Sequence, residues 1–262
     1  MIAAYYNEFD PFAAAWLREL IKAGHIAPGD VDERDMRDVK ADDLKSYTQV
    51  HFFAGIGGWS YALRLAGWAD DRPVWTGSCP CQPFSAAGKG LGTDDERHLW
   101  PVFFDLIRQC RPSVVFGEQV ASKDALHWFD IVQSDLEGEG YAAAAIDFCA
   151  AGIGAPHIRQ RLYWVADAND TRSQGWNIGR DSAEQWPFGS SRMGSERASP
   201  TNSIWRDADW LFCRDGKWRP VEPRTFPLAH GVPNRVGRLR GYGNAIVAPQ
   251  AAMFIEAFLE LK

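Results

Sequence analysis

Apolar and polar positions follow two different periods along the first two thirds of the chain. Short apolar runs such as residues 49–53 favour strands. Other apolar residues recur at helical spacing, first at Phe12, Trp16, Leu20 and Ile21. Because strands and helices alternate, the pattern predicts a parallel sheet covered by helices on both faces. The expected strands are 2–8, 25–31, 49–53, 73–78, 112–120 and 159–165, and the expected helices are 12–21, 61–66 and 102–109.

The composition of the chain changes after Arg161. Residues 169–202 are rich in Ser, Gly, Asn, Asp and Arg and show little periodicity, which is typical of a loop-rich lobe. A helical pattern returns at 247–262, where Pro249 suits a first helical turn. Its expected core face consists of Phe254, Ile255, Phe258 and Leu259.

The composition predicts a globular protein, since 46% hydrophobic residues in a chain of 262 is enough for a core. No apolar run approaches the ~20 residues that a membrane helix needs. The first residues lack the basic start and cleavage site of a secretory signal. The five cysteines are odd in number and widely spread, which favours a reducing compartment over a disulfide framework. We therefore expect a cytoplasmic protein.

The formal net charge of -6 hides an uneven distribution. Residues 158–240 carry 14 Lys and Arg against 9 Asp and Glu, and 13 of the 14 are Arg. The planar guanidinium group suits phosphates and base edges, so a nucleic acid is one candidate partner for this part. A solvated basic surface is the alternative on charge alone.

A glycine turn, GIGG at 55–58, joins an expected strand to an expected helix. Such a turn lets the backbone approach a ligand, with the helix N-terminus facing its negative group. A dinucleotide site would place an acid about 20 residues further on, but no acid lies there in a strand tip. The candidate acids lie upstream, with Glu8 at the tip of the first strand and Asp30 at the tip of the second.

These upstream residues fit an adenosine if the first strand lies beside the strand of the glycine turn. Glu8 could then bind a ribose, Phe9 could cover an adenine face, and Asp30 could accept a hydrogen bond from the adenine amine. A helix N-cap or a solvated turn acid is the alternative at each acidic position.

Six motifs, in chain order, resemble the DNA (cytosine-5) methyltransferases: HFFAGIGGWSYAL, GSCPCQPFSAAGKG, DDERHLW, PSVVFGEQV, APHIRQRLYWVA and GYGNAIVAPQ. They cover most of residues 48–166 and the start of the C-terminal helix. The resemblance implies a Rossmann-like, doubly wound α/β fold with a mostly parallel sheet that binds S-adenosylmethionine, a small target-recognition lobe, and double-stranded DNA as substrate. The implied division is a catalytic domain at 1–167, a recognition lobe at 168–235 and a returning segment at 236–262.

The order of two motifs departs from the family. The segments YYNEFDPFAAAW and PGDV resemble its adenosine-binding motifs, which usually follow the glycine turn, but here they precede it. We therefore expect a permuted chain, because a cofactor site needs strand tips that are adjacent in space rather than in sequence. An independent N-terminal domain is the alternative.

The chemistry of such an enzyme assigns roles to the matching residues. Carbon 5 of cytosine is a poor nucleophile and becomes reactive when a thiolate adds to carbon 6. Cys81 matches the attacking cysteine, while a metal pair or redox pair with Cys79 is the alternative. Protonation at N3 calls for a buried carboxyl group, for which Glu118 is the candidate. Arg159 and Arg161 are expected to hold the cytosine carbonyl, that carboxyl or a phosphate.

Two residues depart from the usual motifs, namely Gln119 in place of Asn and His157 in place of Gln. The loop 84–93 has the glycines to close over DNA after the base has swung out. The expected DNA-binding residues are Ser85, Lys89 and Arg97, and no metal site is expected. The expected cofactor-binding residues are Glu8, Phe9, Asp30, Val31, Phe53, Ala54, Gly55, Gly57, Gly58, Trp59, Pro80 and Asn244.

Three other interpretations remain open. A nicotinamide-dependent oxidoreductase would share the glycine turn and the sheet, but it leaves PCQPFS, Glu118 and the arginine pair unexplained. A relative that methylates transfer RNA would share the cysteine loop. A binding module without catalysis is disfavoured because every residue that the reaction needs is present. We expect the protein to be monomeric.

Overall fold

The computed structural model describes residues 4–79, 99–121, 123–153, 155, 159–169, 209–212, 218–221 and 245–262. Its strands are β1 (Ala4–Asn7), β2 (Gly29–Asp32), β3 (Gln49–Phe52), β4 (Val74–Gly77), β5 (Val114–Val120), β6 (Ala142–Cys149), β7 (Gln160–Asp167), β8 (Asp209–Phe212) and β9 (Trp218–Val221). Its helices are α1 (Pro11–Lys22), α2 (Ala41–Leu44), α3 (Gly58–Leu65), α4 (Trp100–Cys110), α5 (Lys123–Gly138) and α7 (Ala248–Glu260). None of these helices is long and apolar enough to cross a membrane.

Seven strands form one mixed sheet in the order β2-β1-β3-β4-β5-β7-β6, and β8 pairs with β9. In the large sheet β7 is antiparallel to both of its neighbours, and the other four pairs are parallel. The prediction of a mostly parallel α/β sheet is confirmed. The first strand also lies beside the strand of the glycine turn, as the adenosine hypothesis required, with Ala4–Asn7 paired to Gln49–Phe52.

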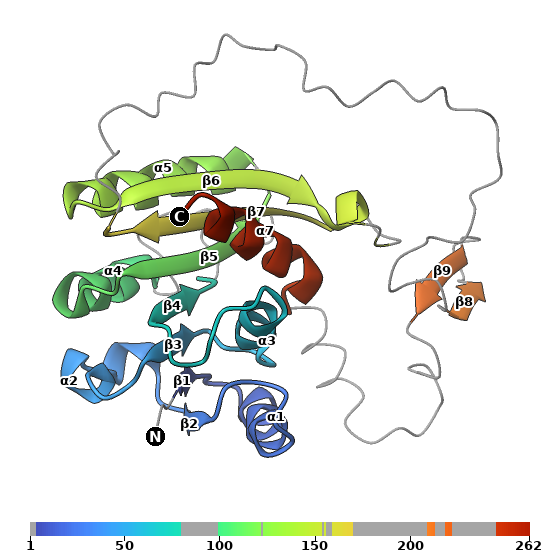
Figure 1. Ribbon diagram of the computed structural model, residues 1–262, viewed down its shortest axis with the longest axis horizontal. Coiled ribbons are helices and arrows are strands. Elements are labelled where there is room, and N and C mark those ends of the chain that lie inside the picture. The colour runs from blue at the N-terminus through green and yellow to red at the C-terminus, as the bar shows by residue number, and fades with distance from the viewer. Residues whose placement is uncertain are drawn as a thin grey trace, which may run out of the picture.

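Helices cover both faces of this sheet, as predicted (Figure 1). Helices α2, α4 and α5 lie on one face, and α1, α3 and α7 lie on the other. The first face has an aromatic core that includes Phe52, Trp75, Trp100, Phe103 and Trp164. The second face has a core that includes Trp59, Phe116, Tyr163, Ile255 and Phe258.

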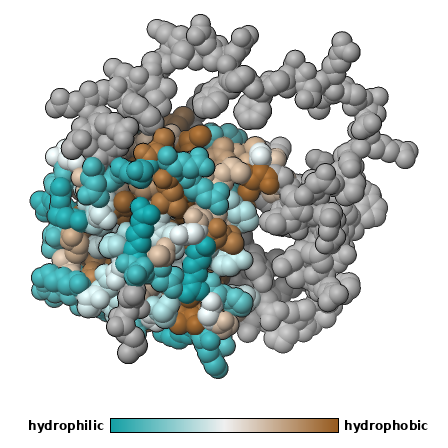
Figure 2. Space-filling view, viewed as in Figure 1, coloured by the Kyte–Doolittle hydropathy of each residue, from teal (hydrophilic) through white to brown (hydrophobic). Residues whose placement is uncertain are grey.

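The C-terminal helix α7 packs against α3, next to the glycine turn. Its first turn contains Pro249, and Ile255 and Phe258 are buried as expected. Figure 2 shows apolar residues gathered over α7 and the neighbouring strands among more hydrophilic surroundings.

Three local features differ from the sequence-based expectation. In α1 the buried positions are Ala13, Ala14 and Leu17, because small residues let the helix approach the sheet closely, whereas Phe12 and Trp16 pack on each other at half-buried positions. Helix α3 starts three residues earlier than predicted, at Gly58, and its N-cap Gly57 adopts a left-handed conformation that glycine allows. Strand β6 contains a run of four alanines, which carries no strand period, and was not predicted.

Candidate active site

The candidate site lies where the parallel strands end. Glu8 follows β1, Phe53 follows β3, Ser78 follows β4, and Glu118 is the fifth residue of the seven in β5. Because the carboxyl ends of parallel strands meet at one edge of a sheet, residues from four separate segments come together there.

The glycine turn after β3 adopts a conformation that few side chains tolerate. Phe53, Gly55 and Gly57 have φ angles of 53°, 56° and 79°. A Cβ atom added at Gly58 would lie 2.7 Å from Cγ1 of Ile246, so the turn also packs tightly on the C-terminal segment. In contrast, a Cβ atom at Gly55 would meet only its own turn, with Phe53 O at 4.0 Å. The turn is thus closely packed behind Gly58 and open at Gly55.

Glu8 joins the first strand to this turn. One carboxylate oxygen accepts a hydrogen bond from the backbone N–H of Gly55 at 2.7 Å, and the other accepts from the N–H of Asp10 at 2.9 Å. The predicted place of Glu8 at the strand tip is confirmed. The neighbouring Phe9 is 69% exposed, so its ring is accessible.

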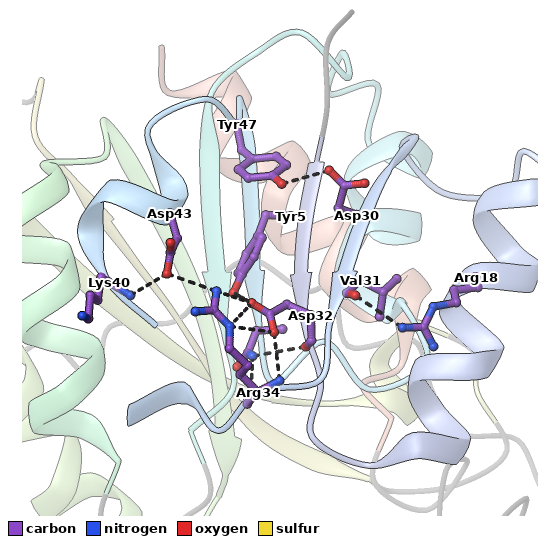
Figure 3. Close-up of polar contacts among 10 residues, drawn as sticks. Tyr5, Arg18, Asp30, Val31, Asp32, Arg34, Lys40, Asp43 and Tyr47 are labelled. Carbon is purple, nitrogen blue, oxygen red and sulfur yellow. Dashed lines mark hydrogen bonds and ion pairs between the residues drawn. The ribbon is translucent and has the colours of Figure 1, made fainter. Parts of the chain in front are cut away.

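The predicted position of Asp30 at the tip of the second strand is wrong. Strand β2 continues to Asp32, because its backbone pairs with β1 over four residues. The carboxylate of Asp30 accepts a hydrogen bond from the Tyr47 hydroxyl at 2.9 Å (Figure 3). Val31, the next residue, packs against the core cluster that contains Leu17 of α1.

Asp32 is the acid that ends β2, and the sequence analysis did not single it out. It accepts hydrogen bonds from the Tyr5 hydroxyl at 2.6 Å and from the Arg34 guanidinium at 2.7 Å (Figure 3). Burial acts to raise the pKa of Asp32, but the hydrogen bonds from Arg34 and Tyr5 outweigh it and hold the pKa below its usual value. These side chains line a cavity of about 370 Å³, together with Arg18, Asp30, Val31, Glu33, Asp43 and Tyr47.

Glu118 is a buried carboxyl group held by an arginine. It is 9% exposed, and its Oε1 lies 2.5 Å from Nε of Arg161 on the neighbouring strand β7. Burial raises the pKa of Glu118, although Arg161, Arg159 and a hydrogen bond with Ser78 oppose this rise. The site therefore brings Glu118 and Arg161 together, as the sequence analysis predicted for the carboxyl.

Arg159 has a different contact. Its Nη2 donates a hydrogen bond to the carbonyl oxygen of Ala245 at 2.6 Å, 86 residues along the chain. Burial and the nearby Arg161 lower the pKa of Arg159, and Glu118 opposes this. Arg159 thus fastens the start of β7 to the segment that leads into α7.

Gln119 connects β5 to the residue before the cysteine loop. Its side chain is buried, its Nε2 donates to the carbonyl oxygen of Cys79 at 3.1 Å, and its Oε1 accepts from the N–H of Val120 at 2.9 Å. Burial raises the pKa of the Cys79 thiol, so this cysteine stays protonated.

A model of the C-5 cytosine-specific DNA methylase family matches residues 69–201, just over half of the chain. The chain belongs to this family. The matched range contains Glu118, Arg159 and Arg161 together with Cys81.

The chain is similar to several type II methyltransferases. It is 26% identical over 184 residues to M.HhaI of Haemophilus parahaemolyticus, covering 55% of this chain and 56% of that protein. It is 25% identical over 248 residues to M.NaeI of Lentzea aerocolonigenes, covering 94% of this chain and 49% of that protein. A crystal structure of Spodoptera frugiperda DNMT2 matches 65% of this chain and 51% of its own with 13% identity and a TM-score of 0.40. The chain spans about half the length of the curated relatives it matches.

Several residues that the sequence predicts for the site lie outside the described residues. For the reaction these are Cys81 and His157, and for the cofactor Pro80 and Asn244. For DNA they are Ser85, Lys89 and Arg97. The residues that the sequence analysis missed are Ser78 and Asp32, which depend on strand register, and the clamp made by Gln119, of which only the unusual residue type was visible.

Proposed function

We propose that the chain transfers a methyl group from S-adenosylmethionine to carbon 5 of a flipped-out cytosine in double-stranded DNA. The observation that carries this proposal is Glu118, a buried carboxyl with a raised pKa, held by Arg161 at the sheet edge in a chain of this family. Gln119, the next residue, bonds to Cys79, only two residues before Cys81. Glu118 is therefore in the strand beside β4, and Cys81 follows β4 in the sequence.

The protein residues divide the reaction into steps. The thiolate of Cys81 adds to carbon 6, and Glu118 gives its proton to N3, so no charge builds up on the ring. Carbon 5 then carries the electron pair that takes up the methyl group. Removal of the carbon 5 proton, expulsion of the Cys81 thiolate and return of the N3 proton to the Glu118 carboxylate restore the aromatic ring and free the product. Arg161 keeps the carboxyl in place and favours its ionised form again after transfer.

The residues at β1 and β3 fit S-adenosylmethionine, which supplies the methyl group as an activated sulfonium. Glu8 would hold ribose hydroxyls through its carboxylate oxygens, and the exposed ring of Phe9 would cover the adenine. Helix α3 starts without a side-chain cap, so its first N–H groups suit the carboxylate of the methionine part.

We also propose that the adenosine-binding motifs are permuted. Strand β1, which carries the motif around Glu8, lies directly beside β3, which carries the glycine turn, yet it comes first in the chain. Strand β2 with Asp30 and Val31 lies next to it at the sheet edge. This adjacency supports the proposal, because a cofactor site needs these segments side by side in space, whether they precede or follow the glycine turn in the chain.

The other roles extend the same proposal. Duplex DNA would bind with Ser85, Lys89 and Arg97 near its backbone, the loop 84–93 would fill the space left by the flipped base, and the arginine-rich lobe 168–235 would select the target. Asn244 and Pro80 would complete the cofactor site. The enzyme would act as a monomer in the cytoplasm of a bacterial or phage-infected cell.

The test uses the full chain and labelled S-adenosylmethionine. We expect label to enter duplex DNA at cytosine carbon 5, and a duplex with 5-fluorocytosine to become covalently attached to the protein because the fluorine cannot leave as a proton does. Cys81→Ser should lose both signals. Label that enters transfer RNA but not duplex DNA would show that the substrate class is wrong, and label in neither would overturn the proposal.

A further inference from the structure

Ser78 lies directly beside the catalytic candidate Glu118. Strands β4 and β5 are parallel, with Thr76 opposite Phe116. Because the register advances by one residue on each strand, two further steps bring Ser78 opposite Glu118, on the same face of the sheet. Placed there, the Ser78 hydroxyl is near enough to act as a hydrogen-bonding group on the ionisation of Glu118.

A second contact fixes the orientation of the Ser78 hydroxyl. The indole N–H of Trp59 donates to Oγ of Ser78 at 3.0 Å. Trp59 is the second residue of α3, directly after the glycine turn, and is only 4% exposed. Its ring stacks on Phe116 with centroids 6.1 Å apart and an interplanar angle of 18°, so the indole is held firmly.

The chemistry of a hydroxyl decides the direction of these bonds. A serine hydroxyl has one proton and two lone pairs, and an indole N–H can only donate. Trp59 therefore uses a lone pair of Ser78, and the hydroxyl proton is left for a neighbouring acceptor. The carboxylate of Glu118 is such an acceptor.

We propose that Ser78 is a positioning residue that donates its hydroxyl proton to Glu118 and is itself oriented by Trp59. The three residues link the helix after the glycine turn to the buried carboxyl through one hydroxyl. Its consequence for methyl transfer rests on the proposed function, whereas the hydrogen bond itself does not.

The direction of the effect follows from the groups that face Glu118. These are Arg161 and the buried Tyr163 of β7, Arg159 directly before β7, and Ser78 directly after β4. Burial raises the pKa of Glu118, and the arginines and Ser78 work against it. A donor to the ionised form lowers a pKa, so removal of the Ser78 hydroxyl should raise the pKa of Glu118.

The test measures the Glu118 carboxyl directly, by carbon-13 NMR titration of glutamate-labelled full chain without DNA. Glu118→Gln identifies the signal by its loss. We expect Ser78→Ala to shift the titration upward by about one pH unit, the size expected for a hydrogen bond to a charged group. Ser78→Thr keeps a hydroxyl and should restore the wild-type titration, while Trp59→Phe should give a smaller upward shift.

Ser113→Ala, at the opposite end of β5, is the matched control and should leave the titration unchanged. An unchanged or lowered pKa in Ser78→Ala, or an upward shift in Ser78→Thr as large as that in Ser78→Ala, overturns the proposal. If the wild type transfers methyl groups, the alkaline limb of its pH–rate profile should move with the titration. If it transfers none, the proposed function fails, but the titration still decides whether Ser78 donates to Glu118.

Discussion

Two glutamates stand at the carboxyl ends of the same sheet in opposite surroundings. Glu8 is partly exposed and accepts hydrogen bonds from two backbone N–H groups, whose positions are set by the fold of the turn. Glu118 is buried and meets the side chains of Arg161 and Ser78. Backbone donors favour a carboxylate that serves as an acceptor, whereas burial favours a carboxyl that can take up a proton. Under the proposed function, one sheet would use the same residue type for cofactor binding at Glu8 and for proton transfer at Glu118.

The largest expected effect comes from Glu118→Gln, which replaces the proposed proton donor with an amide. We expect kcat/KM for methyl transfer to fall by about 10²- to 10⁴-fold, the contribution of a positioned general acid. Affinity for S-adenosylmethionine, measured by calorimetry, should stay at the wild-type value because the proposed cofactor residues Glu8 and Phe53 follow β1 and β3, away from Glu118. A variant that keeps full activity would show that the buried carboxyl has no part in the chemistry.

The same variant tests the pH dependence. The folded-state pKa of Glu118 is raised, so the protonated form that serves as acid is lost as the pH rises through that value. The stability that this group contributes is likewise fully present below its unfolded pKa and is lost as the pH rises through the folded value. Activity of the wild type and its free energy of unfolding should both decline over this interval, and the decline in stability should be absent in Glu118→Gln.

Glu8→Gln tests the glutamate that is proposed to bind the cofactor. A glutamine side chain has one oxygen, so only one of the N–H groups of Gly55 and Asp10 keeps its acceptor. The amide nitrogen faces the second N–H group, so the turn and the ribose site lose an acceptor. We expect affinity for S-adenosylmethionine to fall by about 10- to 100-fold, which corresponds to one hydrogen bond to a charged group. The kcat at saturating cofactor should change little.

Glu139→Gln is the matched control for Glu8, because Glu139 is also a partly exposed glutamate but forms an ion pair with Arg111 and lies outside the cavity of β2. It should bind S-adenosylmethionine as the wild type does. Equal losses of affinity in the two variants would mean that general surface charge, rather than the place of Glu8, governs binding.

The sequence predicted the elements of this site better than their contacts. The period of the hydrophobic residues and the glycine content were enough to predict β1, the turn after β3 and helix α7, because these signals are local. The position of Asp30 was wrong because the end of β2 depends on pairing with β1. The neighbourhood of Ser78 and Glu118 depends on the register between β4 and β5, and no local pattern carries a register. The bond from Arg159 to Ala245 crosses 86 residues and could not be predicted for the same reason.

The smallest expected effect concerns Gln119, which joins strand β5, the strand that carries Glu118, to Cys79 at the start of the cysteine loop. Gln119→Ala leaves the Cys79 carbonyl and the Val120 N–H without their buried partner. We expect a loss of about 1–3 kcal/mol in the free energy of unfolding, measured by urea denaturation. Gln119→Asn is one methylene shorter and cannot keep both bonds, so its stability should lie between those of the wild type and the alanine variant.

The control for this series is Gln133→Ala on the exposed side of α5, where the glutamine bonds only to Glu137 among the contacts described. Its free energy of unfolding should change by no more than about 0.5 kcal/mol, as for most surface substitutions. Because Gln119 holds the backbone two residues before Cys81, kcat should fall with stability along the series from Gln to Asn to Ala while affinity for S-adenosylmethionine is kept. If Gln119→Ala were as stable and as active as the wild type, the hydrogen bonds of Gln119 would contribute neither to the free energy of unfolding nor to kcat.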